Sequence, residues 1–439
     1  MLGALTRARD WRPFKIVDLD LSSGVAAVSG LEGYAGVFAL VWAGGAPLGH
    51  VRVPVRGANC SERRIRSAIR VQLEHPLATA ALRDRLRTGI RSGQEQAAGP
   101  ENRAEAGTET PALPSATVAI CTRDRPEALD RCLGYIERLR YPVLDVVVVD
   151  NAPPDDTVRR LVQEKYPNFR YLCEPQPGLG WARNTALAHS SSEVVAFTDD
   201  DCAPDPSWIE ALGQAFTEDE QTMAITGLVT PFELETPAQI LFERSGGFGR
   251  GFDHQSWRLG TTTGRRGAMH LGAGRFGTGA NMAFRRSVFS SIGDFDVALG
   301  AGTPTEGGED LDMFFRVLEK GYTLVYEPRA VVRHVHRRDL DGLRRQLEGH
   351  GVGLYAYFVR SALMFPNRRR QFLRLALRWF WTRNIRRLLR SFAGSRSFPR
   401  DLVWAELKGS LRGCTAYPRA RRATSRRNGD LAGRPGVVA

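Results

Sequence analysis

The chain has 439 residues, of which 42% are hydrophobic and 25% are charged, an ordinary composition for a soluble protein with room for two domains. The formal net charge is +13, but it is unevenly distributed. From Arg360 onward there are 20 Lys and Arg against 3 acidic residues, so the remaining chain is slightly acidic. This distribution argues against a nucleic-acid-binding core and makes the contacts of the basic C-terminal region a separate question.

The six cysteines form no CxxC pair and no spacing typical of metal ligands. Such scattered thiols fit a reducing compartment better than a disulfide framework. The N-terminal segment lacks the apolar stretch of a secretion signal, and no run approaches the roughly 18 apolar residues that cross a bilayer. We therefore expect a cytoplasmic protein, with peripheral contact on the inner face of the plasma membrane as an open possibility.

Residues 1–91 are predicted to form a small α+β module. Two apolar runs, at 37–42 and 48–55, flank a Gly-Gly-Ala-Pro turn, which is a hairpin signal, and residues 64–86 suit a helix. No residue pattern here points to chemistry, so a packing or interaction module is expected. Residues 92–114 are polar, rich in Gly, Pro and Ala, and lack periodicity, as in a linker.

Residues 115–340 alternate short apolar strands with helical segments. Strands are expected at 117–121, 145–149, 170–173 and 194–197, with helices at 127–139, 156–166 and 180–189. Continuous apolar strands that alternate with helices indicate a mainly parallel sheet covered on both faces. In such sheets, ligands bind beyond the carboxyl ends of the strands.

Polar side chains follow three of these expected strands. The first strand runs into Thr122 and Arg123, the second into Asp150, and a later one into the triple aspartate 199–201. A lone carboxylate at a strand end can accept a hydrogen bond from a uracil or a ribose. Closely spaced carboxylates can hold Mg²⁺ or Mn²⁺, whose other positions remain for phosphate oxygens. A solvated turn is the alternative explanation of the triple aspartate, but its position after a buried strand disfavours that.

Six segments in order carry a resemblance to a known family: CTRDRP, VVVVDNAP, PGLGWARN, AFTDDDC, GTGANMAF and GGEDLD. Over residues 117–336 the chain resembles a family 2 glycosyltransferase of the A-type fold, in particular the actinobacterial-type members with an N-terminal extension. The resemblance implies an α/β fold with a mainly parallel central sheet, a small N-terminal α+β module and C-terminal helices. It also implies inverting, metal-dependent transfer of a sugar from a nucleotide-sugar donor, with a uridine diphosphate sugar expected.

The resemblance assigns roles to particular positions. The residues expected to bind the nucleotide sugar are Thr122, Arg123, Asp150, Arg183, Asp199, Asp200, Gly279, Ala280 and Asn281. Asp201 is expected to bind the Mg²⁺ or Mn²⁺ directly, with Asp199 as a second candidate, and the sequence does not divide the work among the three aspartates. The chain departs from the family pattern at Gly180 and Trp181, where a small residue and a basic one are common.

The segment GGEDLD places acidic residues at the start of an expected helix, where acids are also common simply as caps. An inverting transfer needs one carboxylate to accept the proton of the attacking hydroxyl group. By resemblance Asp310 is this general base, and Glu309 has a structural or acceptor-side role. His334 and His336 face the same side of an expected strand, and His336 is a candidate metal ligand as well as a candidate structural histidine.

Residues 341–398 are expected to form amphipathic basic helices, with one helix at 371–392, and residues 399–439 a basic, disordered tail. In the expected helix, Leu373, Leu377 and Trp381 share a face with other apolar residues, while arginines gather opposite. This pattern suits an anionic membrane surface, and equally a helix packed on the catalytic domain with a solvated basic face.

Three functions follow from these observations. The first is the inverting glycosyltransferase, whose acceptor is unidentified; a lipid-linked or secondary-metabolite acceptor would suit the basic helix. The alternative is a non-catalytic sugar- or membrane-binding protein that retains the fold, against which the intact acidic motifs argue. Nucleic-acid binding is the third and is disfavoured by the charge distribution.

Overall fold

The computed structural model describes residues 12–82, 112–259, 272–392 and 398–432. The chain divides into two compact units: a smaller one built from residues before 114 with the segment 233–237, and a larger one that contains the rest of the described chain. The predicted linker, 92–114, lies almost entirely outside the described residues. Each unit is considered by itself.

The smaller unit is a three-stranded sheet with a helix. Its elements are β1 (Phe14–Asp20), β2 (Gly36–Ala43), β3 (Ala46–Pro54) and α1 (Glu62–Gln72). The predicted hairpin is confirmed: β2 and β3 pair antiparallel around Gly44 and Gly45, which both have positive φ. Strand β1, which was not predicted, pairs parallel to β2 and leaves β3 at an edge. The predicted helix breaks at Leu73 and resumes over residues 74–82.

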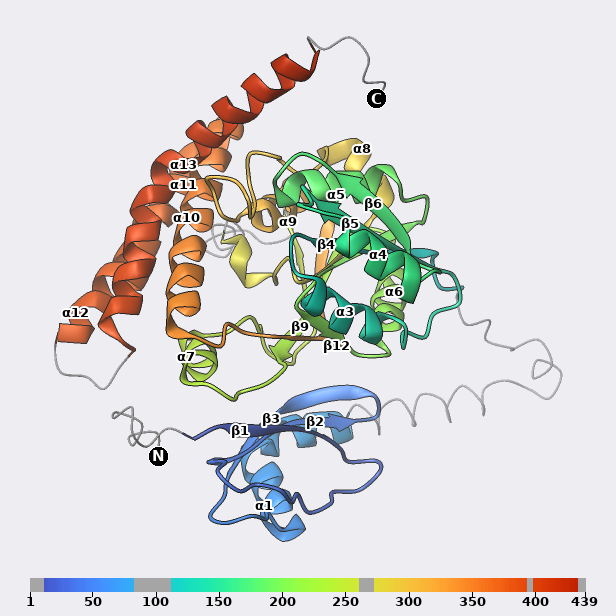
Figure 1. The fold of residues 1–439 in the computed structure, drawn as a ribbon. Helices are drawn as coiled ribbons and strands as arrows, with labels where there is room; N and C mark the ends of the chain where they lie inside the picture. Colours follow the sequence, from blue (N-terminus) through green and yellow to red (C-terminus); the bar gives the residue numbers. More distant parts are fainter. Residues whose placement is uncertain (1–11, 83–111, 260–271, 393–397, 433–439) are drawn as a thin grey trace, which may run out of the picture. The chain divides into compact units, whose positions relative to one another are not determined.

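The larger unit is built on a sheet of nine strands among the described residues, shown with its helices in Figure 1. The strands are β4 (Ala116–Thr122), β5 (Leu144–Asn151), β6 (Arg170–Glu174), β7 (Val194–Asp199), β8 (Cys202–Pro204), β9 (Thr222–Pro231), β10 (Gln255–Arg258), β11 (Asn281–Arg285) and β12 (Thr323–His334). Their order is β10-β12-β9-β11-β7-β4-β5-β6, with β8 beside β12. Strands β7, β4, β5 and β6 run parallel, and β11 is antiparallel to both of its neighbours.

Helices cover both faces of this sheet, as continuous apolar strands require. The helices are α3 (Pro126–Ile136), α4 (Thr157–Lys165), α5 (Leu179–Ala188), α6 (Trp208–Glu218), α7 (Pro237–Ser245), α8 (Phe289–Ile292) and α9 (Glu309–Glu319). Val146 and Val148 of β5 pack with residues of α3, α4 and α6, whereas Val147 and Val149 pack with α5 and α9. The predicted α/β architecture with a mainly parallel sheet is confirmed.

The C-terminal region is helical and packs on the larger unit. It consists of α10 (Leu340–Met364), α11 (Arg369–Trp379), a π-helical segment (Phe380–Ile385), α12 (Arg386–Phe392) and α13 (Arg400–Ala432). The expectation of a disordered tail after residue 399 is wrong for Arg400–Ala432, because α13 packs along α10 and buries residues such as Leu402, Leu407 and Tyr417 (Figure 1). Tertiary contacts therefore stabilise a helix that its composition did not indicate. Across the described chain, the helices are too short or too polar to span a bilayer.

Candidate active site

The carboxyl ends of three parallel strands place their polar residues at one edge of the sheet. In the ladder, Thr122 of β4 is paired with Asp150 of β5, and Cys121 with Asp199 of β7. Since neighbouring parallel strands point the same way, the residues that end them gather at that edge. The sequence-based grouping of these residues thus follows directly from the register.

Asp200 and Asp201 lie in a network of cations and donors. Arg125 Nη1 is 3.0 Å from Asp200 Oδ1 and 3.0 Å from Asp201 Oδ2, and the Thr122 hydroxyl donates to Asp200 Oδ2 at 2.8 Å. His334 Nε2 lies 3.2 Å from Asp201 Oδ1. Arg125 and His334 were not among the predicted site residues. Pairing explains His334: it lies opposite Cys202 in the β8–β12 ladder, directly beside Asp201.

These contacts give neighbouring carboxylates different acidities. Burial raises the pKa of Asp200 to about 6, against the opposing effect of Arg125. Burial also acts to raise the pKa of Asp201, but His334 and Arg125 outweigh it, so the pKa falls well below its usual range. Asp201 therefore stays ionised under any ordinary condition and is suited to a cation.

The fit of a divalent metal depends on how many ligands the protein must supply. The described residues contain no group of three or more His, Cys, Asp or Glu side chains arranged to enclose an ion. Mg²⁺ and Mn²⁺ bound with nucleotides take one or two carboxylates and complete their shells with phosphate oxygens and water. Asp201 is ionised, and the Asp199 side chain is 35% exposed and lines the cavity, so these oxygens fit such a shared ion.

His336 does not contribute to this group. Its Nε2 is 2.8 Å from Glu243 Oε1, and its Nδ1 is 3.0 Å from Nδ1 of His334. His336 was predicted as a candidate metal ligand and also as a candidate structural histidine; its contacts with Glu243 and His334 favour the structural role, and metal binding by either histidine stays a prediction. Of the two, only His334 contacts an aspartate of the triple motif.

Arg183 joins the aspartate group to the acidic start of α9. The side chain is buried, with Nη1 2.8 Å from Glu309 Oε1 and Nη2 3.6 Å from Asp199 Oδ1. Nη2 also reaches the carbonyl oxygen of Gly279 at 3.4 Å. Three segments that are remote in sequence are thereby held by one guanidinium group.

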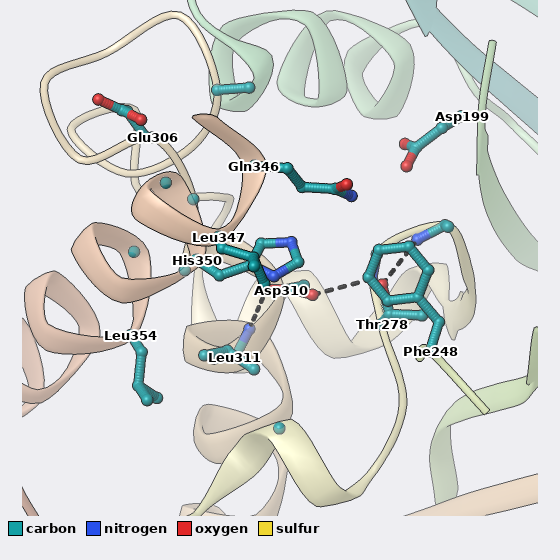
Figure 2. A pocket seen from close by; sticks show the side chains of 18 of the residues that line it. Asp199, Phe248, Thr278, Glu306, Asp310, Leu311, Gln346, Leu347, His350 and Leu354 are labelled. Carbon is teal, nitrogen blue, oxygen red and sulfur yellow. Dashed lines mark hydrogen bonds between the residues drawn. The ribbon is translucent and has the colours of Figure 1, made fainter. Parts of the chain in front are cut away.

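Asp310 is fixed in orientation by backbone donors. Its Oδ2 accepts from the Gly279 N–H at 2.8 Å and its Oδ1 accepts from the Leu311 N–H at 2.8 Å, as Figure 2 shows. Gly308 precedes the helix with a φ of 94°, and a side chain there would meet the Gly353 carbonyl oxygen of α10 at 2.6 Å. Only glycine fits this position without strain.

The loop of residues 277–281 contributes backbone, but its asparagine is structural. Asn281 Nδ2 donates to the carbonyl oxygens of Leu228 and Ala330, at 3.0 and 2.8 Å, and its Oδ1 accepts from the indole of Trp208. The side chain is wholly buried and does not line the cavity. The prediction that Asn281 binds the donor is therefore corrected, whereas Gly279 and Ala280 do line the cavity.

Asp150 is buried at the end of β5 and does not line the cavity. Its Oδ2 accepts from the Tyr171 hydroxyl at 3.0 Å, while Oδ1 has no hydrogen-bond partner among the described residues. Burial raises the pKa of Asp150. A buried acceptor without a partner is costly and is a reason to expect a donor group from a ligand there.

A cavity of about 1320 Å³ is lined by many of these groups, though not by Asp150 or Asn281. Its lining includes Thr122, Arg123, Arg183, the aspartates 199–201, Glu309 and Asp310. It continues past Phe248, Gln346 and His350, which Figure 2 shows near Asp310 and Asp199, to the C-terminal helices. Burial lowers the pKa of His350 to about 4, so this imidazole is neutral at physiological pH. The arrangement can place two charged ligands of nucleotide size in one enclosed space.

Comparisons with known protein families assign this arrangement. The model of glycosyl transferase family 2 matches residues 117–293, and that of glycosyl transferase family group 2 matches residues 238–414. Together the two matches cover the nine-stranded sheet, the strand-end aspartates, and the C-terminal helices as far as residue 414.

The chain therefore contains a glycosyl transferase family 2 domain over residues 117–293.

Two glycosyltransferases are similar to part of this chain. A pre-mycofactocin glycosyltransferase of Mycobacterium tuberculosis is 30% identical over 227 residues, which cover 51% of this chain and 43% of that protein. A glucosyl-dolichyl phosphate glucuronosyltransferase of Haloferax volcanii is 23% identical, covering 50% of this chain and 68% of that protein. The chain thus spans less than half the length of the mycobacterial relative.

A solved structure is also similar. It is the mannosyltransferase PcManGT from Pyrobaculum calidifontis in complex with GDP-Man and Mn²⁺, with 19% identity, a TM-score of 0.40, and coverage of 74% of this chain and 77% of that chain.

Proposed function

We propose that this chain catalyses the inverting, metal-dependent transfer of a sugar from a nucleotide-sugar donor, with a uridine diphosphate sugar expected, to an acceptor hydroxyl group. The observation that carries the proposal is that Asp310 and the aspartates 199–201, from separate elements, open into one cavity. The glycosyl transferase family 2 domain in this chain belongs to an inverting family.

In this proposal Asp310 is the general base. An inverting reaction needs a carboxylate beside the acceptor hydroxyl, on the side of the sugar opposite the leaving diphosphate. The backbone N–H groups of Gly279 and Leu311 hold the Asp310 carboxylate in one orientation. Glu309 is the poorer candidate because it is buried and its Oε1 is paired with Arg183.

The donor would lie along the strand ends. Thr122 and Arg123 line the cavity and would bind the nucleoside. Asp150, whose Oδ1 has no partner among the described residues, is proposed for the same role although it does not line the cavity. Mg²⁺ or Mn²⁺, held by Asp201 with Asp199 or His334, would neutralise charge on the diphosphate of the donor. Arg183 would act on the donor only indirectly, since its polar atoms already contact Glu309, Asp199 and Gly279.

The test is release of nucleoside diphosphate from a panel of nucleotide sugars with Mn²⁺ or Mg²⁺, with a cell extract as the source of acceptor. Asp310→Asn should reduce release by about 10²–10⁴-fold, as the loss of a general base does. Asp201→Ala should abolish the metal dependence. Glu164→Gln, an exposed residue of α4 that does not line the cavity, is the matched control and should retain activity.

A different result would favour the other function weighed from the sequence. Binding of the donor without turnover, unchanged by Asp310→Asn, would indicate a sugar-binding protein that retains the fold. Absence of donor binding under every metal condition would contradict the transferase proposal altogether.

We also propose that the C-terminal helices rest on an anionic membrane surface. Leu373, Leu377 and Trp381 are 54, 71 and 60% exposed, and the neighbouring Arg374 and Arg378 are exposed with them. The face of α11 that packs on the core is formed instead by Phe372 and its neighbours. Exposed leucine and tryptophan among arginines is the composition that binds the interface of anionic bilayers.

A further inference from the structure

One part of the cavity is formed by the C-terminal helices, far in sequence from the aspartates 199–201. Trp379, Arg383 and Arg387 line it from α11, the π-helical segment and α12, and Trp257 lines it from β10. Indole rings and guanidinium groups therefore face the same enclosed space. None of these residues belongs to the proposed donor site.

Arg250 is a half-buried cation in this region without a carboxylate partner among the residues that the structure describes. Within the described residues its guanidinium group donates to backbone carbonyls, those of Gly274 at 2.8 Å, Gly249 at 3.1 Å and Gly247 at 3.4 Å. A side chain at Gly274 would begin 3.8 Å from the side chain of Leu311, the residue after the proposed base. Arg250 is thus held close to the start of α9.

Arg383 is a second cation that faces the cavity. Its guanidinium carbon lies 5.5 Å from the centre of the Trp379 ring, and the side chain is exposed. The nearby carboxylate of Glu406 is already engaged by Arg387, at 2.7 Å. Two arginines therefore have no carboxylate of their own within ion-pair distance in the described part of the chain.

The two arginines are close enough to influence each other. Burial lowers the pKa of Arg250, Tyr326 and Asp310 act to raise it, and Arg383 lowers it further. Burying a cation beside another cation is unfavourable unless an anion compensates. Guanidinium groups bind phosphate and carboxylate in a bidentate manner, so such an anion would be well recognised.

We propose that Arg250 and Arg383 form a subsite for an anionic group, a phosphate or a carboxylate, carried by the acceptor, whose apolar part lies against Trp257 and Trp379. The proposal rests on the transferase function and names the chemical class of its acceptor. The acceptor anion would neutralise the two cations, while the hydroxyl to be glycosylated would lie toward Asp310.

Octyl phosphate, octanoate and octanol serve as probes, titrated into the full chain by calorimetry. The wild type should bind one of the two anions at least about tenfold more tightly than octanol, since a charged hydrogen bond contributes about 1.5–3 kcal/mol. The stronger of the two identifies phosphate or carboxylate. Arg250→Gln and Arg383→Gln should each reduce that preference by about tenfold, whereas Arg370→Gln, an exposed arginine of α11 outside the cavity, should not change it.

Binding of uridine diphosphate with Mn²⁺ to the same variants shows whether the two arginines bind an anion of the acceptor or the diphosphate of the donor. Unchanged nucleotide affinity supports an acceptor subsite, and a parallel loss of nucleotide affinity would show that the arginines bind the donor diphosphate and would overturn the proposal. Equal binding of octanol and the anions would overturn it too. If Arg250→Gln does not fold, the exposed Arg383→Gln carries the test.

Failure of the proposed function is distinguishable from these results. It would appear as a wild-type chain that binds no nucleotide with either metal. If octyl phosphate still bound through both arginines, the anion site would remain, but its assignment to an acceptor would be wrong.

Discussion

Single side chains in this site serve as connections as much as ligands. Arg183 was expected from the family pattern to hold the donor, yet its guanidinium group lies between Glu309 and Asp199. Burial acts to lower the pKa of Arg183, but the charges of Glu309 and Asp199 outweigh it, so the pKa is raised. We infer that Arg183 positions the two acidic segments relative to each other.

Glu309 should make stability depend on pH. Burial raises its pKa from 4.5 to about 7, opposed by Arg183 and assisted by Asp310. The folded state therefore holds the Glu309 proton more tightly than the unfolded state does, so this contribution to stability is complete below pH 4.5 and is lost as the pH rises through about 7. The free energy of unfolding of the wild type, relative to Glu309→Gln, should fall by about 1–3 kcal/mol across that range.

Urea unfolding of the larger unit at a series of pH values measures this difference. Glu164→Gln, at an exposed position of α4, is the control for a generic loss of a carboxylate. Parallel pH profiles of the wild type and Glu309→Gln would show that Glu309 is ionised throughout and that its pair with Arg183 outweighs burial.

The sequence motifs predicted which residues lie near the candidate site more reliably than they predicted which atoms each side chain contacts. Asp150, Asp199 and Asp310 were recognisable because each follows a buried strand or begins a helix within a familiar motif. Asn281 lies in the same kind of motif, but its amide bonds the backbone of the core. His334 and His336 were indistinguishable by spacing, and only the pairing of β12 with β8 places His334 at Asp201.

At the scale of elements, glycines allow the C-terminal helices to pack closely against the loop that precedes α9. Gly353 of α10 lies against Gly307, where a side chain would meet the Gly307 carbonyl carbon at 2.9 Å. On the other side of α10, Gly409 of α13 lies against the backbone of Glu348. Helix α13 thus packs against α10, and α10 packs against the loop directly before Asp310.

Gly409→Ala should destabilise this packing. The new methyl group would collide with the Glu348 carbonyl group, whose carbon lies 2.8 Å from the expected Cβ position. Overpacking of this kind costs about 1–3 kcal/mol, so thermal unfolding should begin at a lower temperature. Thr415→Ala, an exposed position in the same helix, should leave unfolding nearly unchanged. A Gly409→Ala protein as stable as the wild type would show that α13 can shift away without cost.

The prediction of disorder after residue 399 missed α13 because this helix is stabilised by packing against other parts of the chain. The segment is rich in arginine and contains Pro418, and an isolated helix of this composition is marginal in water. Its stability comes from contact with α10, including an ion pair of Arg412 with Glu348, and from a hydrogen bond of Tyr417 to Asp296, between α8 and α9, at 2.9 Å. Local propensity does not report such contacts.

For the whole molecule, the uneven charge gives the chain a basic, partly apolar C-terminal surface. Leu377 and Trp381, with Trp404 and Leu411 of α13, are each at least half exposed. The apolar face predicted for this region included Leu373, Leu377 and Trp381, but the core is covered by other residues of the helix, which leaves these three outward. Part of the predicted apolar face is therefore exposed, and other apolar residues of the helix pack on the core.

Sedimentation with vesicles tests the membrane proposal. The protein should bind vesicles that contain phosphatidylglycerol more tightly than neutral ones, and the difference should shrink at high salt. The double substitution Leu377→Ala with Trp381→Ala should weaken binding by about tenfold or more, given 1.5–3 kcal/mol for each buried large apolar side chain. Val143→Ala, which truncates an exposed apolar residue 60% open elsewhere in the larger unit, should not. Equal loss in both proteins, or no preference for anionic lipid, would contradict the proposal.

By itself the sequence determined the class of fold, the family, and the segments from which the site is built. Strand periodicity and strand-end residues are local properties, so short runs such as DVVVVDN carry them in full. The tertiary structure decided which histidine meets Asp201, that Arg183 pairs with Glu309, that Asn281 is turned into the core, and that α13 is folded. Each of these depends on side chains separated by tens to hundreds of residues, and their energies come from burial and pairing that no local pattern records.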